Sequence, residues 1–305
     1  MNKYNLDIEY IINNLEKSEV NFFRKKKILI LGSDGFIGKY FIQFFYKLIE
    51  KKIHLKVDCV DNHISSSKRK IPNLYNKFFS FYNYDLMKFN SKKKYDLIIF
   101  LAGIASPKIY KKFPIESLEV TYLGAKKFLE KSRTDKSLLI FFSSSEIYGN
   151  PNISNIPTKE KYYGNVNSFG PRACYDEGKR VGETMCYIYK EYMKTKIKII
   201  RPFNIFGPGM NQRDDRVIPK FIRSVRKNEP IKIYNNGKQT RSFCYITDAM
   251  IGFIKVICSG KIGEIYNVGN NKEEISMNSL AKIIKKIYNN KKAKIKNVNY
   301  PNTYP

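Results

Sequence analysis

The sequence has few of the residues from which metal centres and disulfide frameworks are built. Only two histidines occur, His54 and His63, and they cannot make a zinc site on their own. The cysteines are odd in number, lie far apart and form no CxxC motif, so reduced, structural thiols in a cytoplasmic protein are expected. They are Cys59, Cys174, Cys186, Cys244 and Cys258. No metal site is therefore predicted.

Long apolar runs and acidic residues are also scarce. No run reaches the ~18–20 residues that a membrane span needs, and the charged N-terminus lacks the apolar core of a signal peptide. There are 27 acidic residues against 56 Lys and Arg, which gives a net charge of +29. Because the lysines are scattered rather than gathered, this charge indicates a solvated basic exterior. We predict neither a membrane nor a nucleic-acid partner, although such a field favours an anionic small substrate.

The pattern of apolar runs predicts an α/β fold. Short runs rich in β-branched residues alternate with helical segments from Lys27 onwards, as in a parallel sheet covered on both faces. The expected strands lie at 27–31, 54–61, 77–84, 95–103, 137–145 and 197–207. We predict a Rossmann-type doubly wound parallel sheet over 27–203, preceded by an accessory helix in 1–26. Most of 204–305 is expected to form a smaller C-terminal α/β substrate lobe.

A glycine-rich turn, GSDGFIG, follows the first predicted strand and opens a helix. Gly32 would permit the tight turn, Gly35 would let the backbone approach a diphosphate, and Gly38 would allow close packing of helix and strand. The N-terminus of the helix offers N–H groups to the phosphates. This context of strand, turn and helix predicts a dinucleotide site.

An acid is expected at the end of the second strand, where it binds the ribose hydroxyls. Asp61 stands there, and Asp58, in the middle of the strand, is the competing candidate. An acid at this place disfavours a 2′-phosphate, so NAD is predicted over NADP. Lys68 and Arg69, close by in the sequence, keep NADP open.

Two further segments bring candidate catalytic residues to the carboxyl edge of the sheet, where ligands bind in open α/β folds. SSSEIYG, with Ser144 and Glu146, follows the fifth strand, and YDEGK supplies Tyr175 and Lys179. Their spacing of four places the tyrosine and the lysine on one face of a helix. A neighbouring ammonium would lower the pKa of the phenol, so that Tyr175 takes a proton from a sugar hydroxyl as hydride leaves to NAD.

These motifs resemble the extended short-chain dehydrogenase/reductase (NAD-dependent epimerase/dehydratase) superfamily, and within it the UDP-glucuronate decarboxylases most closely. The resemblance covers about 27–269 and is strongest in YYGNVNSFGPRACYDEGKRVGETM. It implies an NAD-binding set of Gly32, Gly35, Phe36, Ile37, Gly38, Asp61, Tyr175 and Lys179, with Asp85 near the adenine. The implied catalytic set is Tyr175 as base, Lys179 as its partner, Glu146 for proton handling and Ser144 on the substrate. Tyr110, Asn204, Arg216 and Arg241 would contact the nucleotide-sugar.

The resemblance also implies the reaction and its alternatives. A 4,6-dehydratase typically carries Asp-Glu at the position of Ser145-Glu146, and serine is a poor proton donor; a 4-epimerase usually lacks the Glu. Ser-Glu favours decarboxylation of UDP-glucuronate to UDP-xylose through a 4-keto intermediate. A dehydratase, an epimerase and a non-catalytic nucleotide- or RNA-binding Rossmann protein remain the alternatives. The resemblance further implies a homodimer, paired through the helix around Leu118 and the helix that contains Tyr175.

Several positions depart from the family pattern. Phe100 stands where a His is usual, Thr121 where an Asn is usual, and Gly209 where an Arg is usual after Gly-Pro. The sequence ends at Pro305, just before a basic residue that completes the sugar-carboxylate site in the family. A truncated lobe, a carboxylate held by other residues and an impaired activity are the three interpretations left open.

Overall fold

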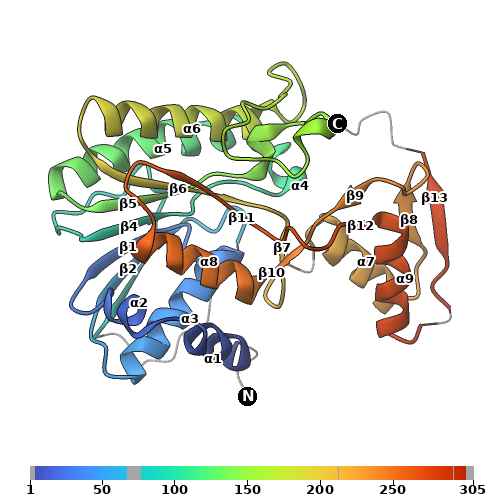
Figure 1. Ribbon diagram of the computed structural model, residues 1–305, viewed down its shortest axis with the longest axis horizontal. Helices are drawn as coiled ribbons and strands as arrows, with labels where there is room; N and C mark the ends of the chain where they lie inside the picture. Colours follow the sequence, from blue (N-terminus) through green and yellow to red (C-terminus); the bar gives the residue numbers. More distant parts are fainter. Residues whose placement is uncertain (1–3, 67–76, 212, 291, 300–305) are drawn as a thin grey trace.

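The computed structural model describes residues 4–66, 77–211, 213–290 and 292–299. Seven strands form one sheet in the order β11-β6-β5-β4-β1-β2-β3, and every neighbouring pair is parallel (Figure 1). The strands are β1 (Lys27–Leu31), β2 (Lys56–Asp61), β3 (Phe79–Asn83), β4 (Leu97–Phe100), β5 (Leu138–Phe142), β6 (Lys196–Pro202) and β11 (Ile265–Val268). The predicted Rossmann-type sheet is thereby confirmed. Its strand order reverses between β1 and β4, the place where such sheets bind ligands.

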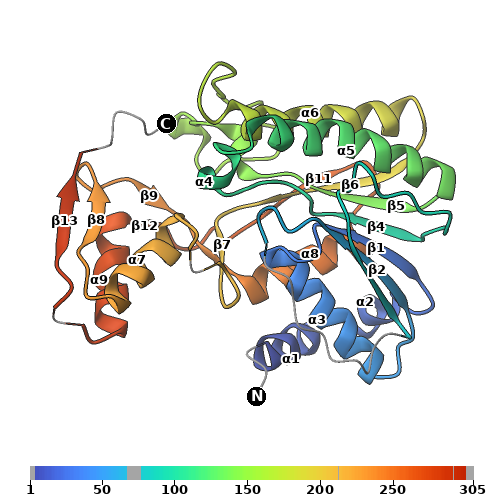
Figure 2. The same cartoon turned by 180° about the vertical axis from the view of Figure 1, so that it is seen from behind.

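Helices cover both faces of this sheet, which explains why the central strands β1, β4 and β5 are apolar along almost their whole length. Side chains alternate along β1: Ile28 and Ile30 face one buried cluster, and Leu29 and Leu31 face another. The first cluster lies under α3 (Phe36–Glu50) and α8 (Ile246–Ser259). The second lies under α5 (Pro114–Asp135) and α6 (Ala173–Glu191), which run side by side in both views (Figures 1 and 2).

The N-terminal segment forms two helices rather than the single accessory helix that was expected. In α1 (Asn5–Asn13), Ile8, Ile11 and Ile12 are buried against the body, on α3 and α8. A second helix, α2 (Lys17–Asn21), begins at a reciprocal capping box of Glu16 and Glu19. Among the described residues, no helix has the length and apolar character needed to span a membrane.

A smaller lobe follows the sheet. It contains α7 (Val217–Arg226), α9 (Met277–Ile287) and the parallel pair β8 (Ile231–Tyr234) and β13 (Ile295–Val298), packed around a core of their own. An antiparallel pair, β9 (Thr240–Arg241) and β12 (Ile275–Ser276), and a parallel pair, β7 (Ile205–Phe206) and β10 (Cys244–Tyr245), lie between lobe and body (Figure 1).

The predicted boundary at residue 203 does not separate these two parts cleanly. Two elements from the C-terminal third belong to the body: α8 packs on the sheet, and β11 pairs with β6. The lobe is therefore made from two stretches of chain, one on each side of α8 and β11.

Candidate active site

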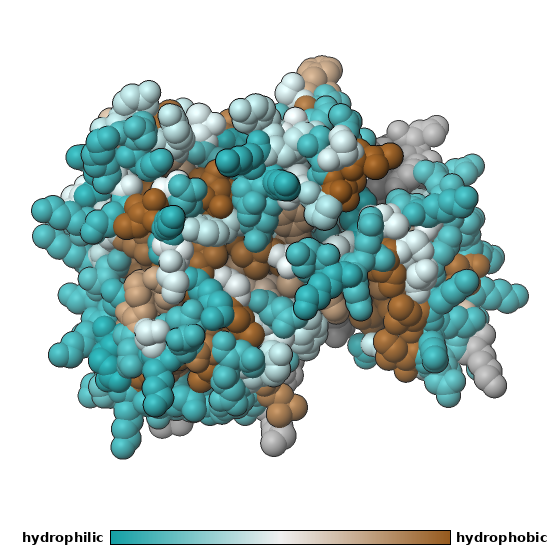
Figure 3. Space-filling view, in the orientation of Figure 1, coloured by the Kyte–Doolittle hydropathy of each residue, from teal (hydrophilic) through white to brown (hydrophobic). Residues whose placement is uncertain are grey.

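A cleft of about 960 Å³ opens at the carboxyl ends of the strands and extends into the lobe. Its walls carry the glycine turn after β1, the segments after β4, β5 and β6, the start of α7, and residues of β8 and β9. The face of the molecule seen in Figure 3 is largely hydrophilic, with apolar patches near its middle. Both the predicted cofactor turn and the predicted catalytic residues line this one cleft.

The glycine turn has the shape of a dinucleotide cradle. Gly32 has φ +80°, and an added Cβ would lie 2.8 Å from the backbone nitrogen of Ala102. At Gly38 a Cβ would lie 2.6 Å from the carbonyl oxygens of Gly32 and Ser33. Gly35 is the N-cap of α3, and it has no side chain that could accept a hydrogen bond from the first turn of the helix. Phe36 and Ile37, in that first turn, line the cleft. The backbone N–H groups of this turn can therefore serve an anionic ligand. The turn thus fits the diphosphate of NAD.

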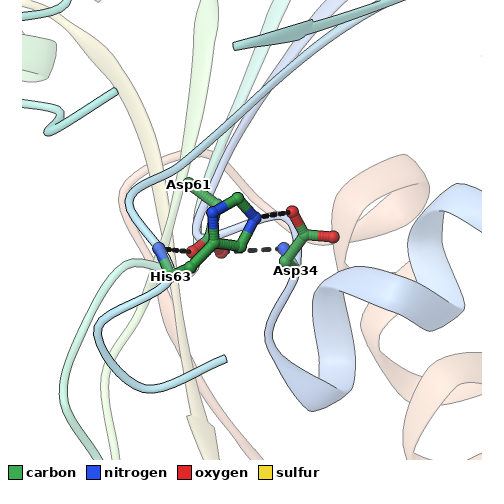
Figure 4. A group of neighbouring side chains, drawn as sticks. All are labelled: Asp34, Asp61 and His63. Atoms are coloured by element: carbon green, nitrogen blue, oxygen red, sulfur yellow. Dashed lines mark hydrogen bonds and ion pairs between the residues drawn. The ribbon is translucent and has the colours of Figure 1, made fainter. Parts of the chain in front are cut away.

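Asp61 stands at the end of β2, and its carboxylate accepts three hydrogen bonds, of which those from the backbone N–H groups of Asp34 and His63 are drawn in Figure 4. Its carboxylate accepts from the backbone N–H of Asp34, the backbone N–H of His63 and the hydroxyl of Ser66, each at 2.8 Å. His63 Nε2 lies 2.7 Å from Asp34 Oδ2, and its Nδ1 lies 2.9 Å from Asn83 Oδ1. The potential ligand atoms of Asp34, Asp61 and His63 lie within 4.8 Å of one another, and these hydrogen bonds explain the cluster without a metal ion.

The other acids predicted for the cofactor site lie elsewhere. Asp58 accepts hydrogen bonds from Lys93 Nζ at 2.8 Å and from the Tyr95 hydroxyl at 2.7 Å, so it is engaged below the edge of the sheet. The Asp85 carboxylate accepts from the backbone N–H of Met87 at 2.8 Å and does not line the cleft; its place near the adenine stays a prediction. Lys68 and Arg69, which kept NADP open, lie outside the described residues.

The catalytic candidates after β5 and on α6 come together as the spacing predicted. Tyr175 is buried, its side chain is hydrogen-bonded to Ser144, and its ring stacks on Tyr110 with 5.8 Å between centroids. One turn along α6, Lys179 Nζ lies 5.9 Å from the centroid of the Tyr175 ring and donates to the carbonyl oxygen of Phe142 at 2.7 Å. The phenol therefore has a hydroxyl partner in Ser144 and a cation, Lys179, near its ring.

The pKa of this phenol is not lowered as expected. Burial raises the pKa of Tyr175, against the smaller opposite effects of the hydrogen bond to Ser144 and the charges of Arg216 and Arg172. Lys179 is buried as well, and burial lowers the pKa of its ammonium to about 8. Desolvation thus dominates the pKa of this phenol, whereas sequence spacing alone had suggested that Lys179 would.

An ion pair that sequence analysis missed holds Glu146. This residue lies in the 3-10 turn η2 (Ser145–Tyr148), whose N-cap is Ser144, and its carboxylate pairs with Arg172 Nη2. Arg172 also donates from Nε to Asp176 at 3.3 Å and lines the cleft. The signal was present in the sequence, because Arg172 precedes Tyr175 by three residues and so shares its side of the chain at the start of α6.

The four predicted substrate residues all line the cleft. The buried Tyr110 hydroxyl, in α4 (Pro107–Tyr110), has no hydrogen-bond partner among the described residues, and burial raises the pKa of Tyr110 to about 12. Asn204 donates to the carbonyl oxygen of Ser242 at 3.1 Å. Arg216 pairs with Asp214 at 2.6 Å, whereas Arg241, on β9, is exposed and donates to the carbonyl oxygen of the neighbouring Thr240 at 2.7 Å.

Two of the departures from the family pattern are packing positions. Phe100 is fully buried and stacks on Phe141 with centroids 5.6 Å apart. Thr121 is buried in α5, and a Cβ on Gly178 of α6 would lie 2.5 Å from its Oγ1. Both residues therefore serve the close contact of sheet and helices rather than the cleft.

Comparison with known proteins shows which family the chain resembles. Residues 28–269 match the model of the NAD dependent epimerase/dehydratase family. The chain belongs to this family. UDP-glucuronic acid decarboxylase 1 of Xenopus tropicalis is 35% identical over 286 residues, which cover 90% of this chain and 66% of that protein. UDP-glucuronic acid decarboxylase 3 of Arabidopsis thaliana is 35% identical over 86% of this chain and 75% of its own length. The chain thus spans about two thirds of the length of its vertebrate relative.

Solved structures of the family share the fold. UDP-N-acetylglucosamine 4-epimerase from Methanobrevibacter ruminantium is 25% identical, with a TM-score of 0.78 over 92% of this chain and 87% of that one. UDP-glucuronic acid 4-epimerase from Bacillus cereus, in complex with UDP-glucuronic acid and NAD, is 25% identical, with a TM-score of 0.71 over 90% of this chain and 86% of that one. The family and the glycine cradle together identify NAD as the cofactor.

Proposed function

We propose that this protein catalyses the NAD-dependent decarboxylation of UDP-glucuronate to UDP-xylose. The observation that carries the proposal is the meeting of Ser144, Glu146, Tyr175 and Lys179 in one cleft, with the Arg172 guanidinium on the acid. Relatives named UDP-glucuronic acid decarboxylase, at about 35% identity, support the same reaction.

Three of these residues, Ser144, Tyr175 and Glu146, have a step in this chemistry. Ser144 would hold the C4 hydroxyl beside Tyr175, whose phenolate form takes the hydroxyl proton as the C4 hydride leaves to NAD. The resulting β-keto acid loses its carboxylate as carbon dioxide, and the enolate left behind takes a proton at C5. Tyr175 then returns its proton to the C4 oxygen as the hydride comes back. Glu146, which is part-exposed at the cleft, would handle the proton at C5.

Arg172 gives the cleft a partner for a sugar acid. Guanidinium groups bind carboxylates bidentately, and the side chain of Arg172 is 41% exposed at the cleft. Its charge also reaches the ring of Tyr110, where it lowers the phenol's pKa against the larger effect of burial. We propose that the uronate carboxylate takes the place of Glu146 on Arg172 when the substrate binds. This would free Glu146 for proton transfer.

Two related reactions give different products. A 4-epimerase is favoured by the structural likeness to the Bacillus cereus enzyme, and it would return a UDP-uronate of unchanged mass. A 4,6-dehydratase would release water from a neutral hexose, and Ser145 at the position of the proton donor argues against it. The non-catalytic RNA-binding alternative predicts salt-sensitive RNA binding without turnover.

The test is to incubate the purified protein with NAD and UDP-glucuronate and to follow the nucleotide-sugars by mass spectrometry. We expect a UDP-pentose, lighter than the substrate by one carbon dioxide. Tyr175→Phe should abolish it, whereas Tyr189→Phe, at the far end of the same helix, should not. A product of unchanged mass that chromatographs as a C4 epimer would overturn the proposal in favour of epimerisation.

We also propose a homodimer and a cytoplasmic location. Large apolar side chains are exposed on the neighbouring helices α5 and α6, as at an interface: Ile115 at 68%, Leu118 at 40%, Tyr122 at 40% and Tyr187 at 56%. Light scattering should give a particle mass twice that of the chain, and Leu118→Glu should reduce the particle mass to that of a single chain. Cell fractionation tests the location.

A further inference from the structure

The N-terminal helix reaches the cleft. Tyr4, the residue immediately before α1, lines the cleft together with Phe36 and Gly209. Its ring meets the Tyr40 ring of α3 edge-on, with 5.1 Å between centroids. Tyr40 meets Phe36 in the same way at 5.8 Å. The N-terminal segment is thus packed on the first turns of the helix whose N-terminus forms the diphosphate cradle.

A carboxylate on α1 accepts hydrogen bonds from α3 and from the end of β10. Asp7 Oδ2 accepts from the Tyr40 hydroxyl at 2.7 Å, and Asp7 Oδ1 accepts from the Tyr245 hydroxyl at 3.4 Å. The Tyr40 hydroxyl also lies 3.1 Å from the carbonyl oxygen of Pro208. Burial and the bond to Asp7 raise the pKa of Tyr40, so its hydroxyl stays a donor at neutral pH. Asp7 therefore joins α3 and the end of β10 directly, and the Tyr40 hydroxyl links it to the turn after β7.

The turn after β7, residues 207–210, packs closely against the N-terminal segment. Gly209 has φ +93°, and a Cβ on it would lie 2.7 Å from the Tyr4 hydroxyl and 3.2 Å from Tyr4 Cε1. The turn leads from Asn204 at the end of the body to Arg216 at the start of α7. Its position therefore affects both of these proposed substrate residues.

We infer that α1 is a positioning element of the active site. Through Tyr4 and Asp7 it holds the 207–210 turn against α3, and so sets how tightly the cleft binds NAD and a UDP-sugar. A turn that is already fixed has less conformational entropy to lose when a ligand binds. The UDP-sugar part of this inference rests on the proposed roles of Asn204 and Arg216. The NAD part does not.

The alternative is that α1 only covers the body. Ile8, Ile11 and Ile12 are buried against α3 and α8, and such a cover would contribute to stability alone. A covering role predicts a lower melting temperature with unchanged ligand affinity, whereas a positioning role predicts weaker binding by folded protein. Glu9 provides a matched control. Its carboxylate also pairs with α3, at 2.7 Å from Lys47 Nζ, but this pair does not involve the turn.

The experiment compares Asp7→Ala with Glu9→Ala. Dissociation constants for NADH, from fluorescence, and for UDP, from calorimetry, are measured well below each variant's melting temperature. We expect Asp7→Ala to bind both ligands roughly 2- to 30-fold more weakly, a range typical of residues that act on a site through a network, and Glu9→Ala to bind like wild type. Wild-type affinity in Asp7→Ala would overturn the inference.

A second measurement covers the case in which Asp7→Ala does not fold. Gly209→Ala is made in the wild type and in Tyr4→Ala, where the clash with the added Cβ is gone but the cost of the positive φ remains. We expect Gly209→Ala to weaken NADH binding more in the wild type, and additive effects would contradict the contact. Neither readout needs turnover. Wild-type protein that binds NADH but not UDP would refute the proposed substrate and leave the NAD part of the inference standing.

Discussion

Replacing Arg172 with Met tests recognition of the substrate's charge. The Arg172–Glu146 pair is exposed by 41% and 39% on its two sides, so the loss of this pair alone should change the free energy of unfolding by only ~0–1 kcal/mol. The 3.3 Å bond from Arg172 Nε to the buried Asp176 is lost as well, at a further cost of ~1–3 kcal/mol, so binding is measured well below the variant's melting temperature. A sugar carboxylate on the same guanidinium is a charged hydrogen-bonding partner, worth about 1.5–3 kcal/mol. Arg172→Met should therefore weaken UDP-glucuronate binding roughly 10- to 150-fold.

Calorimetry on NAD-loaded protein in a Tyr175→Phe background, which prevents turnover, measures this effect directly. UDP-glucuronate, UDP-glucose and UDP are titrated in turn, and the loss should be confined to UDP-glucuronate. Arg133→Met is the control, because Arg133 pairs with Glu130 on the exposed side of α5. An equal loss for all three ligands would show that Arg172 supports the cleft as a whole, and the reasoning from charge would be refuted.

Two further predictions concern the cofactor cradle and the lysine. Gly38→Ala puts a Cβ 2.6 Å from two carbonyl oxygens, so NADH affinity by fluorescence should fall at least ~10-fold, at a cost of more than about 1.4 kcal/mol; an unchanged affinity would contradict the cradle. Burial lowers the pKa of Lys179 from 10.5 to about 8, so between these values the unfolded chain binds more protons and stability rises with pH. Lys179→Met should consequently be more stable relative to wild type at about pH 7.5 than at about pH 9.5, by ~2 kcal/mol in urea unfolding.

The sheet could be predicted because its strands are buried on both faces. Runs such as KILIL carry enough apolar residues to mark a strand whatever surrounds them. The assignment of β11 to the body could not be predicted in this way. Its sequence, IYNV, is short and only partly buried, and its partner β6 lies far away in the chain. Pairing between distant strands leaves no local pattern.

The site was predictable where one element supplies the geometry. The glycine turn, Asp61 at a strand end and the spacing of Tyr175 and Lys179 each depend on a single local structure. Sequence analysis missed the contacts that join separate elements: Arg172 with Glu146, and His63 with Asp34. The pKa of Tyr175 was misjudged for a related reason, since burial depends on every element that packs around the ring.

The return of the chain to the body at α8 and β11 has a consequence for how the protein is made. During synthesis from the N-terminus, β6 is complete at residue 202, but its neighbour at the sheet's edge ends only at Val268. In between, the ribosome must produce α7, β8 and the whole of α8. The edge of β6 that pairs with β11 in the folded protein is therefore unpaired while part of the lobe is synthesised. Since exposed edges of parallel sheets are prone to aggregation, this interval leaves the nascent chain open to aggregation at the β6 edge.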